Sequence, residues 1–450
     1  MSLEGAIAVT RFGLGASKNE IEIASHLPKA WLLEQLTARG TKNIAFDGLA
    51  SSSNAYRVAK AYRRERKAMI GDDKAVASKK YGKTVRSIFQ AKTQARAVYA
   101  AQTETPFHER LTRFWSNHFS VSARSRNTRL LAGAYEREAI RPHILGGFSD
   151  LASEAIFHPA MLVFLDNVSS IGPGSRAGQK RDKGLNEHLA REVLELHTVT
   201  PAASYSQSDV TEFAKALTGW TIGRKDSDGK MIGKTVFSRR KHEPGVRLVL
   251  GQKYSAQGKN QARSILKNIC MRPETAENIA RKLAQHFVSD TPPSELVAEL
   301  KGSFLNTQGN LTALYKTLVH SPYCWTESAQ KVKTPEELLT STARMIGLEN
   351  TFPRRARDSY DSLAHPPFGA PTPEGWPDTA ESWIGPDSMM KRIEWANELA
   401  SRLPSLDSRA FLQSALGERT FQATLEAVSR AESSKQAFIL ALMSPEFQQR

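Results

Sequence analysis

Helical periodicity extends over nearly the whole chain and restricts its fold more than any other feature of the sequence. Apolar residues recur at spacings of three and four positions from Asn19 to Arg39, which predicts a helix or a helix pair broken near Pro28. The same spacing recurs from Pro273 through the closing segment Phe411–Met443. No series of strands alternating with helices is present, which excludes a Rossmann-type parallel sheet. The chain has 450 residues, of which 40% are hydrophobic, so it has enough apolar material for a large core. We therefore predict an all-α, multi-helix globular fold.

One short region has a different pattern. Between Thr235 and Tyr254, the apolar segments VF and RLVL are separated by charged residues and by the turn signal Pro244–Gly245. Short apolar segments on either side of a Pro-Gly turn are typical of paired strands. We expect one small β-hairpin in this otherwise helical chain.

Two helix starts are marked by capping signals. Ser206 precedes Asp209 by three positions, which is the spacing of a capping box. Thr334, Pro335 and Glu337 are residue types preferred at the N-cap, first and third positions of a helix. We expect a helix to begin at each place.

The sequence lacks features that define other classes of protein. No apolar run approaches the roughly 20 residues that a membrane span needs. The N-terminal segment MSLEGAIAVTRFGLGA lacks the basic start and long apolar stretch of a secretory signal, so we expect a cytoplasmic location. The two cysteines, Cys270 and Cys324, are too few for a disulfide framework or a zinc–cysteine site.

Positive charge is concentrated in one segment. The chain has 62 Lys and Arg against 46 Asp and Glu, and the segment Tyr56–Thr103 contains 13 basic residues and only three acidic ones. The segment is either a solvated helical arm whose long side chains cover apolar surface, or a binding surface for an anionic polymer or a partner protein. We expect one large domain, 1–450, made of a basic helical arm at 55–104, a core at 105–350, and an irregular Pro- and Trp-containing segment with the C-terminal helices at 351–450.

The segment NEHLAREVLEL, Asn186–Leu196, carries the densest group of chemically active side chains. On a helix of 100° per residue, apolar residues occupy two opposite faces, with a polar stripe between them. We expect this helix to be largely buried, and buried charges must pair or hold a cation. The stripe consists of Glu187, His188, Arg191, Glu192 and Glu195.

Two interpretations of this stripe remain open. In the structural one, Glu187–Arg191 and Arg191–Glu195 form a ladder of ion pairs four residues apart. In the functional one, the side chains form an acid–base or divalent-metal site, as helical bundles do with facing side chains. The catalytic candidates are then Glu192, Glu195, His118, Glu187 and Arg191, and the metal-ligand candidates are His118, Asp166, Glu192, Glu195 and His242.

Several motifs occur together and in order: RFGLGA (Arg11–Ala16), AWLLEQL (Ala30–Leu36), RFWSNHFSVS (Arg113–Ser122), FLDN (Phe164–Asn167), NEHLAREVLELHTV (Asn186–Val199), YSQSDVTEFAKALTGWT (Tyr205–Thr221), HEPG (His242–Gly245) and PEGWP (Pro373–Pro377). Together they resemble the large bacterial family catalogued as domain of unknown function 1800. The resemblance covers nearly the whole chain but implies no settled activity. His188 stands where the family usually has Asn, which argues against a fixed ligand there. Members are often encoded beside secreted sulfatase-like proteins, which implies an envelope or periplasmic role as the alternative location.

Two classes of function follow from these observations. The first is an enzyme with a buried Glu/His site, with or without a divalent metal, that acts on an anionic or polymeric substrate; hydrolysis is the simplest reaction for it. The second is a non-catalytic binding or assembly protein, in which the polar helix is a structural ladder and the basic arm binds a polyanion or partner. Nucleic-acid binding through Tyr56–Thr103 alone is a third and weaker alternative.

Overall fold

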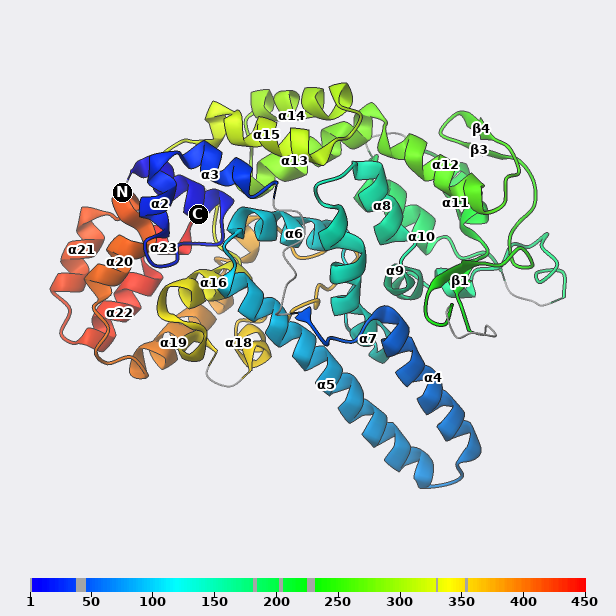
Figure 1. Cartoon of the computed structure of the whole chain (residues 1–450), viewed down its shortest axis with the longest axis horizontal. Coiled ribbons are helices and arrows are strands. Elements are labelled where there is room, and N and C mark those ends of the chain that lie inside the picture. Colours follow the sequence, from blue (N-terminus) through cyan, green and yellow to red (C-terminus); the bar gives the residue numbers. More distant parts are fainter. Residues whose placement is uncertain are drawn as a thin grey trace.

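The fold is built almost entirely from helices. The computed structural model describes residues 2–37, 46–180, 184–201, 205–224, 231–328, 331–352 and 355–450. Within these ranges the chain forms 23 α-helices and two small antiparallel sheets, which confirms the all-α prediction (Figure 1). None of the described helices combines the length and the apolar character needed to cross a bilayer.

The two ends of the chain lie together at one end of the molecule, where the N-terminal helices meet the C-terminal ones (Figure 1). The predicted break near Pro28 is confirmed, because one helix ends at His26 and the next begins at Pro28. Residues from the C-terminal helices form their own buried apolar cluster. The helices at this end are α1 (Leu3–Ile7), α2 (Glu20–His26), α3 (Pro28–Glu34), α16 (Pro335–Ile346), α17 (Leu348–Thr351), α18 (Ala356–Ser362), α19 (Pro386–Ser401), α20 (Ser408–Leu416), α21 (Gln422–Ser429), α22 (Ser434–Met443) and α23 (Pro445–Gln448).

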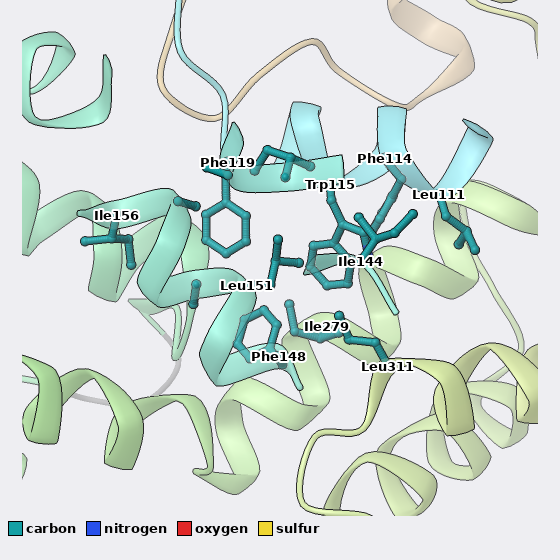
Figure 2. Close-up of a cluster of buried hydrophobic side chains, with 14 of the residues drawn as sticks. Leu111, Phe114, Trp115, Phe119, Ile144, Phe148, Leu151, Ile156, Ile279 and Leu311 are labelled. Atoms are coloured by element: carbon teal, nitrogen blue, oxygen red, sulfur yellow. The ribbon is translucent and has the colours of Figure 1, made fainter. Parts of the chain in front are cut away.

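A second and larger apolar cluster fills the centre of the molecule. Figure 2 shows its aromatic part, in which Trp115, Phe119 and Phe148 pack together. The indole nitrogen of Trp115 donates a 2.6 Å hydrogen bond to the hydroxyl of Tyr315, so this large buried side chain leaves no polar atom unpaired. The surrounding helices are α6 (Pro106–His118), α7 (Arg126–Tyr135), α8 (Phe148–Ile156), α9 (Pro159–Phe164), α10 (His188–Glu192), α11 (Gln207–Leu217), α12 (Lys259–Cys270), α13 (Pro273–Phe287), α14 (Ser294–Asn306) and α15 (Leu311–His320).

Both capping predictions are confirmed. At the start of α11 and of α16, the side chain of the N-cap residue, Ser206 or Thr334, accepts a hydrogen bond from the third residue. In return, the carboxylates of Asp209 and Glu337 accept a hydrogen bond from the backbone amide of the N-cap residue. This fixes the orientation of Glu337, which lines the cavity described below.

The strands pair differently from the simplest interpretation of the sequence. The two apolar segments between Thr235 and Tyr254 do not pair with each other. Instead β2 (Thr235–Phe237) pairs with β1 (Trp220–Ile222), while β3 (Arg247–Val249) pairs with β4 (Gln252–Tyr254). The second pair is the small hairpin, because Leu250 and Gly251 both have positive φ, as a tight two-residue turn requires.

The basic segment forms two long helices, α4 (Ser52–Ala68) and α5 (Asp73–Gln102), whose joined ends project from the body (Figure 1). Tyr62 and Tyr81 stack at 4.0 Å between ring centroids and hold the two helices together. The C-terminal part of α5 enters the body, where Lys92 and Arg96 are buried. The excess charge therefore does not lie wholly on the projecting part.

Candidate functional site

A cavity of about 200 Å³ lies between α6, α13, the start of α16 and the segment 365–378. This volume suits a small organic molecule, since one water occupies about 30 Å³ of liquid. Buried polar side chains contribute much of the lining, although its surface also includes aromatic rings. The basic members on which the argument depends are Arg96, Arg110, Arg113, His118, His286 and His365.

Helix α6 supplies one wall through residues at helical spacing. Residues three and four apart lie on one side of a helix. Arg110, Arg113, Phe114, Asn117 and His118 follow this spacing, and all line the cavity. The motif RFWSNHFSVS therefore contributes its polar members and Phe114 to the cavity, while Trp115 and Phe119 lie in the core shown in Figure 2.

The motif PEGWP also lines the cavity and is hydrogen-bonded directly to α6. The side chain of Asn117 donates a 2.9 Å hydrogen bond to the carbonyl of Trp376 and accepts a 2.8 Å bond from its amide. Gly375 has φ +97°, and a Cβ there would lie 2.5 Å from the carbonyl oxygen of Asn117. Glycine is therefore required for this close approach.

Two consecutive carboxylates at the start of α16 neutralise the arginines of α6. Glu336 pairs with Arg96 and lies 3.1 Å from Arg113, while Glu337 pairs with Arg110 and lies 2.8 Å from Arg450. Although burial alone would raise the pKa of each glutamate, the neighbouring arginines hold both below their usual value.

The surroundings of the cavity nevertheless favour negative charge. Burial and repulsion by Arg450 lower the pKa of Arg110 to about 9. Burial, with Arg419 close by, lowers the pKa of Lys333 to about 7. A pKa lowered in this way means that the positive form is disfavoured where it lies. An anion bound in the cavity would stabilise the charged form of Arg110, which lines it.

Among the side chains of the lining, His286 and Asp378 form the pair best arranged for acid–base chemistry. Nδ1 of His286 lies 2.5 Å from Oδ2 of Asp378, and the pKa of Asp378 is about 2, lowered by the pairing against the effect of burial. Because an ionised carboxylate only accepts hydrogen bonds, Nδ1 carries the proton and Nε2 has the free lone pair. Burial lowers the pKa of His286 to about 4, so the ring is uncharged at neutral pH.

Five buried nitrogen atoms of the lining have no hydrogen-bond partner within the described part of the chain. A buried polar atom without a partner costs about 1–3 kcal/mol and needs an explanation. A polar ligand that enters the cavity would provide one. The atoms are Nε of Arg110, Nη2 of Arg113, Nδ1 of His118, Nε2 of His286 and Nδ1 of His365.

Among the predicted catalytic residues, only His118 lines this cavity. Its Nε2 lies 3.2 Å from the carbonyl of His197, and burial lowers its pKa. The expected burial of the charged stripe on α10 is wrong, since the side chains of Glu187, Arg191 and Glu195 are 27%, 37% and 31% exposed.

The error lies in which part of the segment meets solvent. The apolar residues Leu189, Val193 and Leu194 are buried, while the charged side chains between the two apolar faces lie at the surface. Helical spacing shows which residues share a face, but not which face is covered by the rest of the protein. Arg191 lies 3.4 Å from each of Glu187 and Glu195, which is the ladder that the structural interpretation predicts.

Glu192 also lies outside the cavity, although it is near its edge. Its pKa is raised by partial burial and by the neighbouring charge of Glu195, with a smaller effect from Glu374, which lines the cavity. In the described ranges of the chain, Glu192, Glu195 and His118 do not form a group that could hold a metal ion.

The other two predicted metal ligands lie elsewhere. Asp166 is exposed and lines a separate pocket against Tyr56 and Arg63 of α4. Nδ1 of His242 lies 3.0 Å from the carbonyl of Thr218. Among the described residues, no three His, Cys, Asp or Glu side chains form a group that could hold a metal ion. The five-residue metal-ligand set is therefore not brought together.

A third pocket contains Ser52, His158 and Glu138, residue types that suggest a catalytic triad. Nε2 of His158 lies 3.2 Å from the Ser52 hydroxyl and 3.1 Å from Glu138, but its Nδ1 accepts a hydrogen bond from the amide of Ala160. Nε2 must then carry the ring proton and cannot take one from Ser52. This pocket therefore lacks a general base on His158.

Sequence reasoning missed the His286–Asp378 pair. The two residues are 92 positions apart, and neither belongs to a recognisable local motif. The one signal was indirect: Asp378 directly follows the PEGWP motif, in a segment too rich in aromatic residues to be a plain linker.

The fold and the cavity define a mainly helical protein with a buried ionic site between its central and C-terminal helices. The chain belongs to the family described as protein of unknown function (DUF1800), whose model matches residues 7–449, so the resemblance noted above is confirmed. Neither the curated proteins nor the solved structures contain a significant match to it.

Proposed function

We propose that the protein is an enzyme whose active site is the cavity beside α6, and that it hydrolyses a small anionic substrate with His286 as general base. The observation that carries the proposal is the free Nε2 of His286, which is buried at the cavity while Asp378 holds the other ring nitrogen. A histidine oriented by a carboxylate, with an unpaired nitrogen at a cavity, has the geometry of a general base.

An anionic substrate is supported by the charges around the cavity. Nη2 of Arg113 is buried without a partner, although the same guanidinium pairs with Glu109 and Glu336. An arginine in this position can donate a charge-assisted hydrogen bond to a carboxylate or phosphate oxygen. The lowered pKa of Arg110 also favours a negative ligand.

The chemistry assigns one role to each group. A water molecule gives a proton to Nε2 of His286, and its oxygen forms a bond to the carbon or phosphorus atom of the substrate. The bond to the leaving group breaks, and the leaving group takes the proton back from Nε2. Asp378 holds the ring and stabilises its charged form, while Arg113 stabilises negative charge on the substrate.

The test combines turnover and binding. Hydrolysis of chromogenic esters that carry a carboxylate, phosphate or sulfate group is measured for the native chain, His286→Gln and Asp378→Asn. We expect His286→Gln to lower kcat at least about 100-fold, which is the usual contribution of a general base. His320→Gln, on an exposed histidine, is the matched control.

Calorimetry provides the independent measurement. Binding of an anion should raise the pKa of His286, so the protein should take up protons on binding at pH 6, and less so in His286→Gln. Equal turnover by the native chain and His286→Gln would contradict the catalytic role. Equal affinity for every anion after Arg113→Gln would contradict the anionic substrate.

One observation favours a non-catalytic binding protein as the second candidate. Most carboxylates around the cavity are already paired with arginines, as in a structural network. In that case anions bind to the cavity and Arg113→Gln weakens their binding, but no ester is hydrolysed. The same two measurements therefore separate the candidates.

A further inference from the structure

Two large apolar side chains are exposed at the far end of the projecting arm. Ile70, in the link between α4 and α5, is 85% exposed, and Val76, near the start of α5, is 67% exposed. Elsewhere in the arm, apolar residues such as Ala77 and Val85 are buried between the helices. The exposed pair therefore contributes little to packing within the arm.

The sides of the arm are strongly basic. Eleven exposed cations lie along its two helices, against three exposed acids, Glu65, Asp72 and Asp73. Asp73 lies in the first turn of α5, where the positive end of the helix dipole stabilises it. The cations are Arg57, Lys60, Arg63, Arg64, Arg66 and Lys67 on α4, and Lys74, Lys79, Lys80, Lys83 and Arg86 on α5.

From this arrangement we infer that the end of the arm docks on the surface of an anionic lipid bilayer. Ile70 and Val76 enter the boundary between head groups and acyl chains, while the lysines and arginines bind the anionic head groups. Asp72 and Asp73 lie beside the apolar pair and stay at the level of the head groups, so the insertion is shallow. Figure 1 shows that the joined end of α4 and α5 lies far from the rest of the protein, which leaves it free to reach a flat surface.

The exposed apolar pair favours a lipid surface over a nucleic acid. A phosphate backbone would pair with the cations, but it offers no apolar region to Ile70 and Val76. A lipid bilayer complements both features. The stacked Tyr62 and Tyr81 hold the helices together, so the end of the arm is presented as a preformed unit.

The experiment measures co-sedimentation of the full chain with vesicles at 0.1 M salt. One set of vesicles is pure phosphatidylcholine, and the other contains one third phosphatidylglycerol. We expect binding to the anionic vesicles only. The double variant Ile70→Ser/Val76→Ser should weaken binding at least about tenfold, because two side chains lose their burial. The triple variant Lys79→Gln/Lys80→Gln/Lys83→Gln should weaken it by a similar factor and lower its dependence on salt.

Matched controls come from other surfaces of the same chain. Leu27→Ser/Ile384→Ser removes two apolar residues that are 69% and 52% exposed. A second control replaces three exposed lysines with glutamine, at Lys253, Lys259 and Lys267. Both controls should bind anionic vesicles as the native chain does. All substituted residues are exposed, so folding is retained, which circular dichroism verifies.

Two results would overturn the inference. One is undiminished vesicle binding by Ile70→Ser/Val76→Ser. The other is an absence of vesicle binding by the native chain together with tight binding of duplex DNA that depends on the three lysines but not on the apolar pair. The second result would identify the arm as a polyanion-binding surface instead.

Discussion

Nδ1 of His286 lies 2.5 Å from Oδ2 of Asp378, although 92 positions of sequence separate the two residues. Helix α13 supplies the histidine at its last turn, and the segment after the PEGWP motif supplies the aspartate. The aspartate also lies 3.5 Å from both Lys331 and Arg450, so its charge is shared among three partners. The pair therefore depends on the correct meeting of the central helices with the C-terminal part of the chain.

The first prediction concerns the tautomer of His286. Asp378→Asn removes the charge that holds the proton on Nδ1. The native ring should show the nitrogen chemical shifts of a single neutral tautomer, with an unprotonated Nε2, in NMR of histidine-labelled protein at pH 7. In Asp378→Asn these shifts should move toward a mixture of tautomers. Asp361→Asn, on an exposed aspartate, should leave them unchanged. A native Nε2 that carries the proton would disprove this assignment.

The second prediction concerns stability in mild acid. Burial lowers the pKa of His286 and of His365 to about 4. Between about pH 6.5 and 4 the unfolded chain therefore binds protons that the folded chain does not, so the free energy of unfolding falls as the pH falls. In this window each histidine adds up to about 1.4 kcal/mol per pH unit to the slope of the unfolding free energy against pH. Below its folded pKa it adds nothing to that slope, because the ring is then protonated in both states.

His365→Gln tests this slope. In urea unfolding at several pH values, the unfolding free energy should fall less steeply between pH 6.5 and 4 in His365→Gln than in the native chain. His26→Gln, on an exposed histidine, should keep the native slope. A stability that stays constant down to pH 4.5 would show that the buried histidines titrate normally.

The third prediction compares two glutamates. Glu195 is 31% exposed and lies 3.4 Å from Arg191, so Glu195→Gln should cost less than about 1 kcal/mol of unfolding free energy. Glu336 is only 16% exposed and pairs with both Arg96 and Arg113, so Glu336→Gln should cost more, up to about 3–5 kcal/mol. Each arginine then loses one of its two counter-charges and keeps the other, Glu136 or Glu109. Urea denaturation at pH 7 measures both values. Equal losses in the two variants would mean that the ladder on α10 is more important to the core than its exposure indicates.

The fourth prediction compares two glycines within helices. Gly82 of α5 has open space where a Cβ would lie, so Gly82→Ala should raise the unfolding free energy by up to about 1 kcal/mol through helix propensity. At Gly133 of α7, a Cβ would lie 2.8 Å from Cβ and Cδ of Lys92. Gly133→Ala should instead lower the unfolding free energy by about 1–3 kcal/mol, because Lys92 is buried and has little room to move. In thermal unfolding, the Tm should rise in Gly82→Ala and fall in Gly133→Ala.

Local signals in the sequence predicted the helices well and the site poorly. The capping residues Ser206 and Thr334 identified the starts of α11 and α16, because a cap depends only on residues three positions apart. The polar stripe that contains Glu192 and Glu195 predicted a buried site, because helical spacing shows which residues share a face. It does not show which face meets solvent, and the charged stripe lies at the surface while Leu189 and Val193 are buried.

The sequence by itself determined the helical class, the capped starts of α11 and α16, the break at Pro28 and the basic character of α4 and α5. Each of these follows from interactions within one or two turns of the chain. Only the tertiary structure decided which side chains meet: it placed His286 against Asp378 and paired the consecutive glutamates of α16 with arginines of α5 and α6. It also left the polar stripe of residues 187–195 partly exposed. Burial and long-range contact set the charge and the free lone pairs of these groups, and neither property is encoded in the spacing of residues along one helix.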